Sequence, residues 1–280
     1  MRSPDFFLVG APKCGTTALY EMLGAHPEIF VSPIKEPDFF ASDIRASVVQ
    51  KEAINDWSQY LRLFNGAGPE QAVGEGSVSY LASRVAAAAI YKRNPHARIL
   101  MVLRDPADRL FSHYSAAIAA RSTRDTFADW LRGVAAREQT DPAPTGPVVA
   151  GRYGVSFQRY LAVFPASRIH IVWYDDYVTD TAATVRLIFR FLGVDETQQV
   201  PVDIRRNETR VVKSRVLSGI VTLANLFTDG LADRIGLTAR YNLRFSSTDR
   251  EAAIRLYEDD IRRLADLTGR DLSRWTSVKG

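Results

Sequence analysis

Short apolar runs alternate with helical patterns along most of this chain. The runs at 6–9, 72–74, 99–103 and 169–173 are short and rich in apolar residues, which is typical of strands buried on both faces of a parallel sheet. Between them, apolar positions recur at helical spacing. This alternation predicts an α/β fold: a central parallel sheet flanked by helices on both faces.

The helical patterns have recognisable ends. The first pattern covers 16–24, and Pro27 prevents its continuation. The last opens with a T-x-x-E capping box at Thr248, presents one apolar stripe and ends at Gly269. The helices predicted between them are an alanine-rich helix capped by Ser83 that ends before Pro95, one that opens at Pro106, and two over 126–137 and 156–164.

The chain has 280 residues and shows no internal repeat or linker, so we predict one domain over 1–280. We place its core at about 5–215 and a C-terminal helical part at about 216–280. A proline-rich stretch over 141–147 is either an active-site lid or a surface connector. The apolar segment 216–228 either covers the core or lines an acceptor pocket.

Charge, cysteine count and apolar run lengths exclude several classes of function. The chain has 36 basic and 32 acidic residues, and this net charge of +4 does not indicate a nucleic-acid partner. A single cysteine, Cys14, excludes an internal disulfide and suits a reducing compartment. The histidines and the cysteine have no metal-ligand spacing. No run is long enough for a transmembrane helix and no signal peptide is evident, so we expect a cytoplasmic protein.

The strongest candidate binding site lies near the start of the chain. The apolar run at 6–9 leads into a glycine-containing loop with Lys13, and then Thr16 and Thr17 open a helix. Backbone N–H groups in such a loop and the dipole of the helix both attract an anion. Lys13 precedes Gly15, whereas the triphosphate-binding loop carries its lysine after the last glycine. We therefore predict a site for a phosphate or a sulfate ester.

A second anion contact is predicted at Arg104, which follows the strand at 99–103. The carboxyl ends of parallel strands face the crevice in which ligands bind, and a guanidinium matches phosphate oxygens bidentately. Arg109 lies further along, and we expect it to pair with Asp105 or Asp108.

The loop Pro12-Lys13-Cys14-Gly15-Thr16-Thr17 resembles the 5′-phosphosulfate loop of sulfotransferases that use 3′-phosphoadenosine 5′-phosphosulfate (PAPS). The resemblance covers about 5–215 and is closest to the heparan-sulfate-type and bacterial branches. It continues in order through Lys35-Glu36-Pro37-Asp38-Phe39-Phe40, through Leu103-Arg104-Asp105-Pro106 with Arg109 and Ser112, and through 189–193.

This resemblance implies a P-loop-like domain that moves a sulfuryl group from PAPS by in-line displacement. The acceptor would be a hydroxyl or an amine of a carbohydrate, a lipid or a small molecule. The product would be 3′,5′-adenosine bisphosphate, and no metal is expected. The implied donor-binding residues are Lys13, Cys14, Gly15, Thr16 and Thr17 around the 5′-phosphosulfate, Arg104 and Ser112 at the 3′-phosphate, and Arg215 in a closing basic segment.

The resemblance also implies an acceptor side. Glu36 stands where the family carries its general base, and Lys13 would act on the departing phosphate. His113 and His96 remain weaker candidates for the base, because histidine serves as the base in the cytosolic branch. The implied substrate-binding residues are Lys35, Asp38 and Glu75.

Two other functions stay open from the sequence alone. A P-loop kinase using ATP and magnesium is favoured by Asp175 and Asp176, which follow the apolar run at 169–173. A non-catalytic nucleotide-binding protein would bind PAPS without turnover. A requirement for magnesium would favour the first, and a Glu36→Gln change without any functional effect would favour the second.

Overall fold

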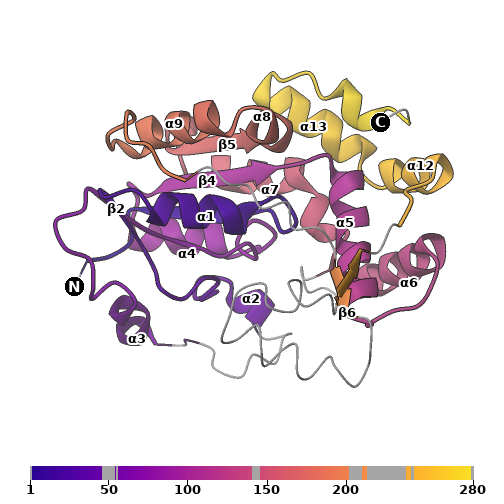
Figure 1. Ribbon diagram of the computed structural model, residues 1–280, viewed down its shortest axis with the longest axis horizontal. Coiled ribbons are helices and arrows are strands. Elements are labelled where there is room, and N and C mark those ends of the chain that lie inside the picture. The colour runs from indigo at the N-terminus through magenta and orange to yellow at the C-terminus, as the bar shows by residue number, and fades with distance from the viewer. Residues whose placement is uncertain are drawn as a thin grey trace.

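A five-stranded parallel sheet forms the centre of the computed structural model, which describes residues 2–45, 54, 56–140, 146–201, 210–212, 238–240 and 243–278 (Figure 1). The strand order is β2-β3-β1-β4-β5. All neighbours pair in parallel, so the carboxyl ends of the strands share one edge. The strands are β1 (Phe6–Gly10), β2 (Ile29–Val31), β3 (Ala72–Gly76), β4 (Arg98–Leu103) and β5 (Ile169–Trp173).

Helices cover both faces of this sheet. The crossover from β1 to β2 and the crossover from β3 to β4 run in opposite directions across the sheet, so right-handed connections place α1 and α4 on opposite faces. His26, just after α1, contacts Phe189 of α9, and Tyr91 of α4 contacts Phe164 just after α7. The four helices are α1 (Thr16–Gly24), α4 (Ala86–Arg93), α7 (Tyr153–Leu161) and α9 (Thr181–Leu192).

The remaining elements surround this central unit. Helix α13 packs on α7, and α12 packs on α5 and α6. Strands β6 and β7 form an antiparallel pair. These elements are α2 (Ser42–Arg45), α3 (Trp57–Arg62), α5 (Pro106–Ala119), α6 (Phe127–Thr140), α8 (Tyr174–Thr179), α12 (Ser247–Arg255), α13 (Glu258–Thr268), β6 (Arg210–Val212), β7 (Thr238–Arg240) and the 3₁₀ turns Val149–Gly151, Ala166–Arg168 and Ser273–Thr276.

The central strand is buried along its whole length. Phe6 and Leu8 of β1 have no exposed surface, and each such side chain contributes about 1.5–3 kcal/mol by burial. Gly74 of β3 makes room for the Phe6 ring, because a Cβ atom there would lie 2.5 Å from that ring. A Gly74→Ala change would therefore disturb the centre of the sheet on which the loop after β1 depends.

The predicted α/β architecture is confirmed, including the boundaries of α1 and the position of Pro106 at the start of α5. The short strand β2 was missed. The single C-terminal helix predicted from Thr248 is wrong: the chain forms α12 and then α13, and Ser246 caps α12 by accepting the N–H of Asp249. The break lies at Tyr257, whose side chain is fully buried. Gly269 ends α13 in the left-handed conformation, as predicted.

Several predicted features lie outside the described residues. These are most of the proline-rich stretch 141–147, the apolar segment 216–228 and Arg215. The division into one domain stays a prediction. Among the helices that are described, none combines the length and the apolar character that a bilayer span requires.

Candidate functional site

The loop between β1 and α1 turns sharply at the carboxyl edge of the sheet. Lys13 and Gly15 have φ angles of 67° and 77°. A Cβ atom at Gly15 would lie 3.2 Å from the Tyr177 ring, so both backbone conformation and space favour glycine there. No side chain among the described residues caps α1. The first N–H groups of α1 therefore lack a side-chain cap and could bind an anion.

Arg104 lies next to this loop. The N–H of Ala11 donates to the Val102 carbonyl at 2.8 Å, which holds the loop against the end of β4. The Arg104 guanidinium lies 4.8 Å from the centre of the Tyr174 ring, which follows β5. Partial desolvation, then the positive charges of Arg104 and Arg109, lower the pKa of Lys13. Three cations therefore gather at one place, and an anion bound among them would relieve their repulsion.

The predicted pairing of Arg109 with Asp105 or Asp108 is wrong. Both carboxylates instead accept hydrogen bonds from Arg250 of α12, and the Arg250–Asp105 pair is buried. Asp105 caps α5 by accepting the N–H groups of Ala107 and Asp108. Its carboxylate therefore faces α12, while Arg109 points inward.

Arg109 has no exposed surface. Its Nη2 donates to the Pro147 carbonyl and lies 3.4 Å from the Tyr257 hydroxyl. In the part of the chain that the structure describes, Nε and Nη1 of Arg109 have no hydrogen-bond partner. A buried positive charge thus stands close enough to the loop to lower the pKa of Lys13.

Ser112 and His113 follow in the second turn of α5, and both are partly buried. Burial, then the charges of Arg109 and Lys13, lower the pKa of His113 to about 4. This makes His113 a weak base near neutral pH. His96 precedes β4 and therefore lies at the amino edge of the sheet, away from the loop. The lowered pKa of His113 and the position of His96 therefore favour neither histidine as the base.

Glu36 lies in a turn after β2, also at the carboxyl edge. Its N–H donates to the Gly76 carbonyl at 2.9 Å, which fixes the turn to the end of β3. The side chain remains 42% exposed, and its Oε1 is 2.5 Å from Lys35 Nζ. A carboxylate that reaches solvent at this edge of the sheet can accept a proton from an incoming hydroxyl.

Asp38 and Glu75 lie behind this turn. The carboxylate of Asp38 is buried and accepts the Ser79 hydroxyl, while its N–H donates to Ser77 Oγ at 3.1 Å. Glu75 has no exposed surface, and burial raises its pKa to about 7. A direct contact of Glu75 with an acceptor, as predicted, is therefore not supported, because the side chain is enclosed.

Cys14 is fully buried, 3.8 Å from the Tyr153 hydroxyl. Burial raises the pKa of its thiol. The thiol therefore stays protonated near neutral pH, which does not suit a nucleophile. Beside it in the loop region, Thr16 is buried and Thr17 is exposed.

One member of the acidic pair after β5, Asp176, pairs with an arginine from the C-terminal part of the chain. Asp175 and Asp176 lie in the first turn of α8, and Asp176 accepts two hydrogen bonds from Arg270 at 2.8 and 2.9 Å. Among the described residues, no group of three acidic, histidine or cysteine side chains is placed to hold a metal ion.

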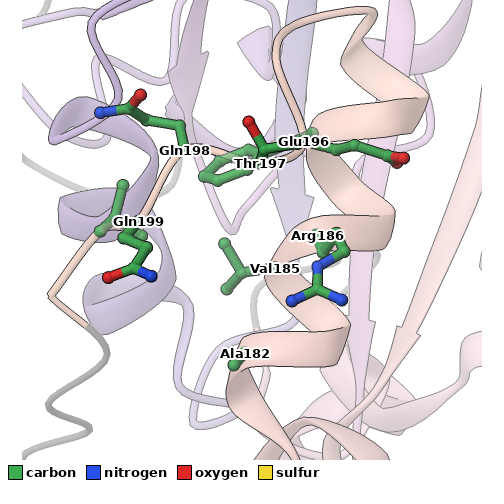
Figure 2. Close-up of a pocket in the computed structure, with 9 residues that line it drawn as sticks. Ala182, Val185, Arg186, Glu196, Thr197, Gln198 and Gln199 are labelled. Atoms are coloured by element: carbon green, nitrogen blue, oxygen red, sulfur yellow. The ribbon is translucent and has the colours of Figure 1, made fainter.

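A pocket of about 310 Å³ lies beside α9 (Figure 2). Ala182, Val185 and Arg186 line it from the helix, and residues 196–200 line it from the segment that follows. None of the predicted site residues lines this pocket, so it is separate from the cationic loop.

Sequence reasoning missed the contacts that come from distant segments. Arg250 and Tyr257 reach α5 from the C-terminal helices, and Tyr60 reaches Glu75 from α3. No local pattern signals such contacts. Only the apolar stripe of the C-terminal segment indicated that these helices pack on the core.

The chain matches the family model described as "Sulfotransferase domain" over residues 3–215. It is 25% identical over 245 residues to carbohydrate sulfotransferase 15 of Homo sapiens, across 68% of this chain and 44% of that protein. It is 27% identical over 193 residues to heparan sulfate glucosamine 3-O-sulfotransferase 5 of Mus musculus, across 68% of this chain and 54% of that protein. The chain thus spans about half the length of these curated relatives.

The structure is also similar to a solved one. A sulfotransferase from Alicyclobacillus acidocaldarius superposes with a TM-score of 0.79 and 28% sequence identity. The superposition covers 99% of this chain and 100% of that one, including the C-terminal helices beyond residue 215.

Proposed function

The chain belongs to the sulfotransferase family, and from that membership we propose that it transfers a sulfuryl group from PAPS to an acceptor hydroxyl or amine. One observation supports this most directly: Lys13 and Arg104 lie at the carboxyl ends of the neighbouring strands β1 and β4. PAPS carries a phosphosulfate and a separate phosphate, so it requires two anion contacts. After transfer, 3′,5′-adenosine bisphosphate would leave.

The donor contacts follow from the positions of the loop and α5. Backbone N–H groups after Gly15 would hold the 5′-phosphosulfate, and Arg104 with Ser112 would hold the 3′-phosphate. Arg215 remains a proposed contact outside the described residues. The full set that we propose is Lys13, Cys14, Gly15, Thr16, Thr17, Arg104, Ser112 and Arg215.

The chemical step is an in-line displacement at sulfur. The acceptor oxygen forms a bond to sulfur while the bond between sulfur and the bridging oxygen breaks, and the electron pair leaves with the phosphate. Lys13 would donate to that bridging oxygen as its negative charge grows. Glu36 would accept the proton of the acceptor hydroxyl. These side chains supply the charge and the proton transfer, so we propose no metal.

The acceptor that we propose first is a carbohydrate hydroxyl. Support comes from the printed names of the curated relatives, a carbohydrate sulfotransferase and a glucosamine 3-O-sulfotransferase. Lys35, which is partly exposed beside Glu36, would suit an acceptor that is already anionic. Lipids and small molecules are the alternatives, because the family fold alone does not choose among acceptors.

The test is sulfuryl transfer by the purified protein. We expect labelled sulfate to move from PAPS to a member of a panel of carbohydrates, lipids and phenols, without added magnesium. Glu36→Gln should lower the rate by about 10²–10⁴, and Lys13→Ala should lower it by about 10² or more. Glu21→Gln, which changes an exposed carboxylate on α1, is the matched control.

Two outcomes would contradict the proposal. Transfer of phosphate from ATP in the presence of magnesium would indicate the kinase. Donor binding without turnover for every acceptor in the panel, unchanged in Glu36→Gln, would indicate a binding protein.

A further inference from the structure

Glu75, at the end of β3, is enclosed by hydroxyl groups. Its Oε1 accepts hydrogen bonds from Tyr60 at 2.7 Å and Tyr80 at 2.8 Å, and its Oε2 accepts one from Ser77 at 2.6 Å. The side chain has no exposed surface. A buried carboxylate persists only when its oxygens are well satisfied, and among the described residues three hydroxyls do this.

Two of these hydroxyls also hold the backbone of the neighbouring turn. Ser77 Oγ accepts the N–H of Asp38 at 3.1 Å, and the Tyr80 hydroxyl accepts the N–H of Phe40 at 3.2 Å. A hydroxyl that donates to a carboxylate is polarised, so it becomes a better acceptor. The hydroxyls of Ser77 and Tyr80, which we call the two relays, therefore connect Glu75 to the backbone of residues 38–40.

The turn needs such support. Glu36 and Asp38 have φ angles of 61° and 52°, in the left-handed region that non-glycine residues rarely adopt. Backbone conformations of this kind persist only when the surrounding structure holds them. The end of β3 does so at three points: the Gly76 carbonyl, Ser77 and Tyr80.

Taking the proposed function as the premise, we propose that Glu75 is a positioning residue for sulfuryl transfer. Through Ser77 and Tyr80, the buried carboxylate fixes the turn at residues 36–40 and so directs the exposed Glu36 carboxylate at the acceptor. Glu75 itself touches no substrate, because it is enclosed.

The network depends on the charge of Glu75. Only the ionised carboxylate accepts all three hydroxyl protons; a protonated one must donate its own proton, and one hydroxyl then loses its acceptor. Burial first, and Asp38 to a lesser extent, raise the pKa of Glu75 to about 7, against the effect of the three hydroxyls. The turn should therefore become more ordered, and the reaction faster, as the pH rises through about 7. The titratable groups around Glu75 are Tyr60 from α3, Tyr80 after β3, Asp38 from the turn, Tyr20 from α1 and Tyr160 from α7.

The experiment removes each relay separately. In Tyr80→Phe and Ser77→Ala, kcat should fall about tenfold, which corresponds to one lost hydrogen bond, while KM for PAPS changes less than about twofold. Exchange of the Asp38 and Phe40 amide protons, followed by NMR, should become faster. Glu75→Gln should show the same loss of kcat, and the dependence of kcat on pH near 7 should disappear.

Tyr160→Phe is the matched control, since it removes a buried hydroxyl whose hydrogen bond, among the described residues, goes to the Tyr80 carbonyl at 3.1 Å. It should leave kcat and both amide protons as in the wild type. Wild-type kcat and wild-type amide protection in both relay variants would overturn the proposal, even if Glu75→Gln fails to fold. A wild-type protein without sulfuryl transfer would instead contradict the proposed function, and amide exchange would still test the relays.

Discussion

At the residue scale, Lys13 and Arg104 are proposed to contact different groups of the donor, the 5′-phosphosulfate and the 3′-phosphate. Lys13 follows β1 in a left-handed conformation that places it on the loop, and Arg104 follows β4. Arg109 adds a buried charge without a carboxylate partner in the described part of the chain. The three positive charges repel one another, and an anion bound among them would relieve that repulsion.

Arg104→Ala should mainly weaken binding of the donor. A charged hydrogen-bonding pair contributes about 1.5–3 kcal/mol, so we expect the affinity for 3′,5′-adenosine bisphosphate to fall about tenfold to a hundredfold by calorimetry. Arg168→Ala is the control, because Arg168 donates to the His96 carbonyl at the opposite edge of the sheet, at 2.9 Å. Equal affinities for Arg104→Ala and the wild type would show that the second anion contact lies elsewhere.

Lys13 and Arg104 could be proposed from the sequence because the pattern around each residue is local. A lysine in a glycine-containing loop before a helix, and an arginine directly after an apolar strand, can be recognised within a few residues. The partner of Arg109 was predicted wrongly for the same reason. Spacing along α5 suggested that Arg109 pairs with Asp105. The Asp105 carboxylate instead accepts a hydrogen bond from Arg250, which lies 145 residues further along the chain.

At the element scale, α12 holds the start of α5. Asp105 caps α5 and accepts the Arg250 guanidinium on its other oxygen. Arg250 also donates to the Ser277 carbonyl at 3.0 Å, which ties the end of the described chain to the same place. Because Arg104 directly precedes this cap, the orientation of its backbone depends on a helix that lies beyond the segment matched by the family model.

Arg250→Met should therefore destabilise the protein and weaken donor binding together. Removing one partner of a buried ion pair typically costs about 3–5 kcal/mol of unfolding free energy, measurable by denaturant titration. Arg270→Met is the control, since its partner Asp176 is 55% exposed and such pairs contribute about 0–1 kcal/mol. An equal loss of unfolding free energy in both variants would mean that the buried Arg250 pair stabilises the protein no more than the exposed Arg270 pair does.

Two features that the sequence analysis missed have weak local signals. Strand β2 has only three residues, too few for its apolar residues to be distinguished from a loop. The break between α12 and α13 was missed because the apolar stripe continues across it: Ile254 and Ile261 are both buried on the core side. Long strands and α1 were predicted because burial on both faces and a sharp glycine turn leave clear signals.

At the scale of the whole molecule, the strand order explains why these side chains meet. β1 is central, and the chain leaves it toward β2 on one side while β4 lies on the other. Ligands of open α/β sheets bind where such connections diverge, at the carboxyl edge. Lys13, Glu36, Glu75 and Arg104 all follow or end strands there, although they lie far apart in the sequence.

The burial of Glu75 should make the free energy of unfolding depend on pH. The pKa of Glu75 is raised by burial from 4.5 to about 7, so between these values the folded chain binds a proton that the unfolded chain has lost. The contribution of Glu75 to the free energy of unfolding therefore falls by roughly 3 kcal/mol as the pH rises from about 4.5 to 7. His113 acts in the opposite sense, because its pKa is lowered to about 4 and the unfolded chain binds the extra proton up to about pH 6.5.

These two groups should largely cancel in the wild type, and single variants should separate them. Between pH 5 and 6.5, the stability of Glu75→Gln should rise with pH relative to the wild type, and that of His113→Asn should fall relative to it, in denaturant titrations at each pH. Parallel curves for Glu75→Gln and the wild type would contradict the raised pKa of Glu75. If the curves diverge as expected, Glu75 of the folded chain stays protonated over this range, and the charge that orders the Glu36 turn appears only as the pH rises through about 7, where the loss of stability is complete. The protein would then give up some stability to hold a buried charge that its proposed reaction uses.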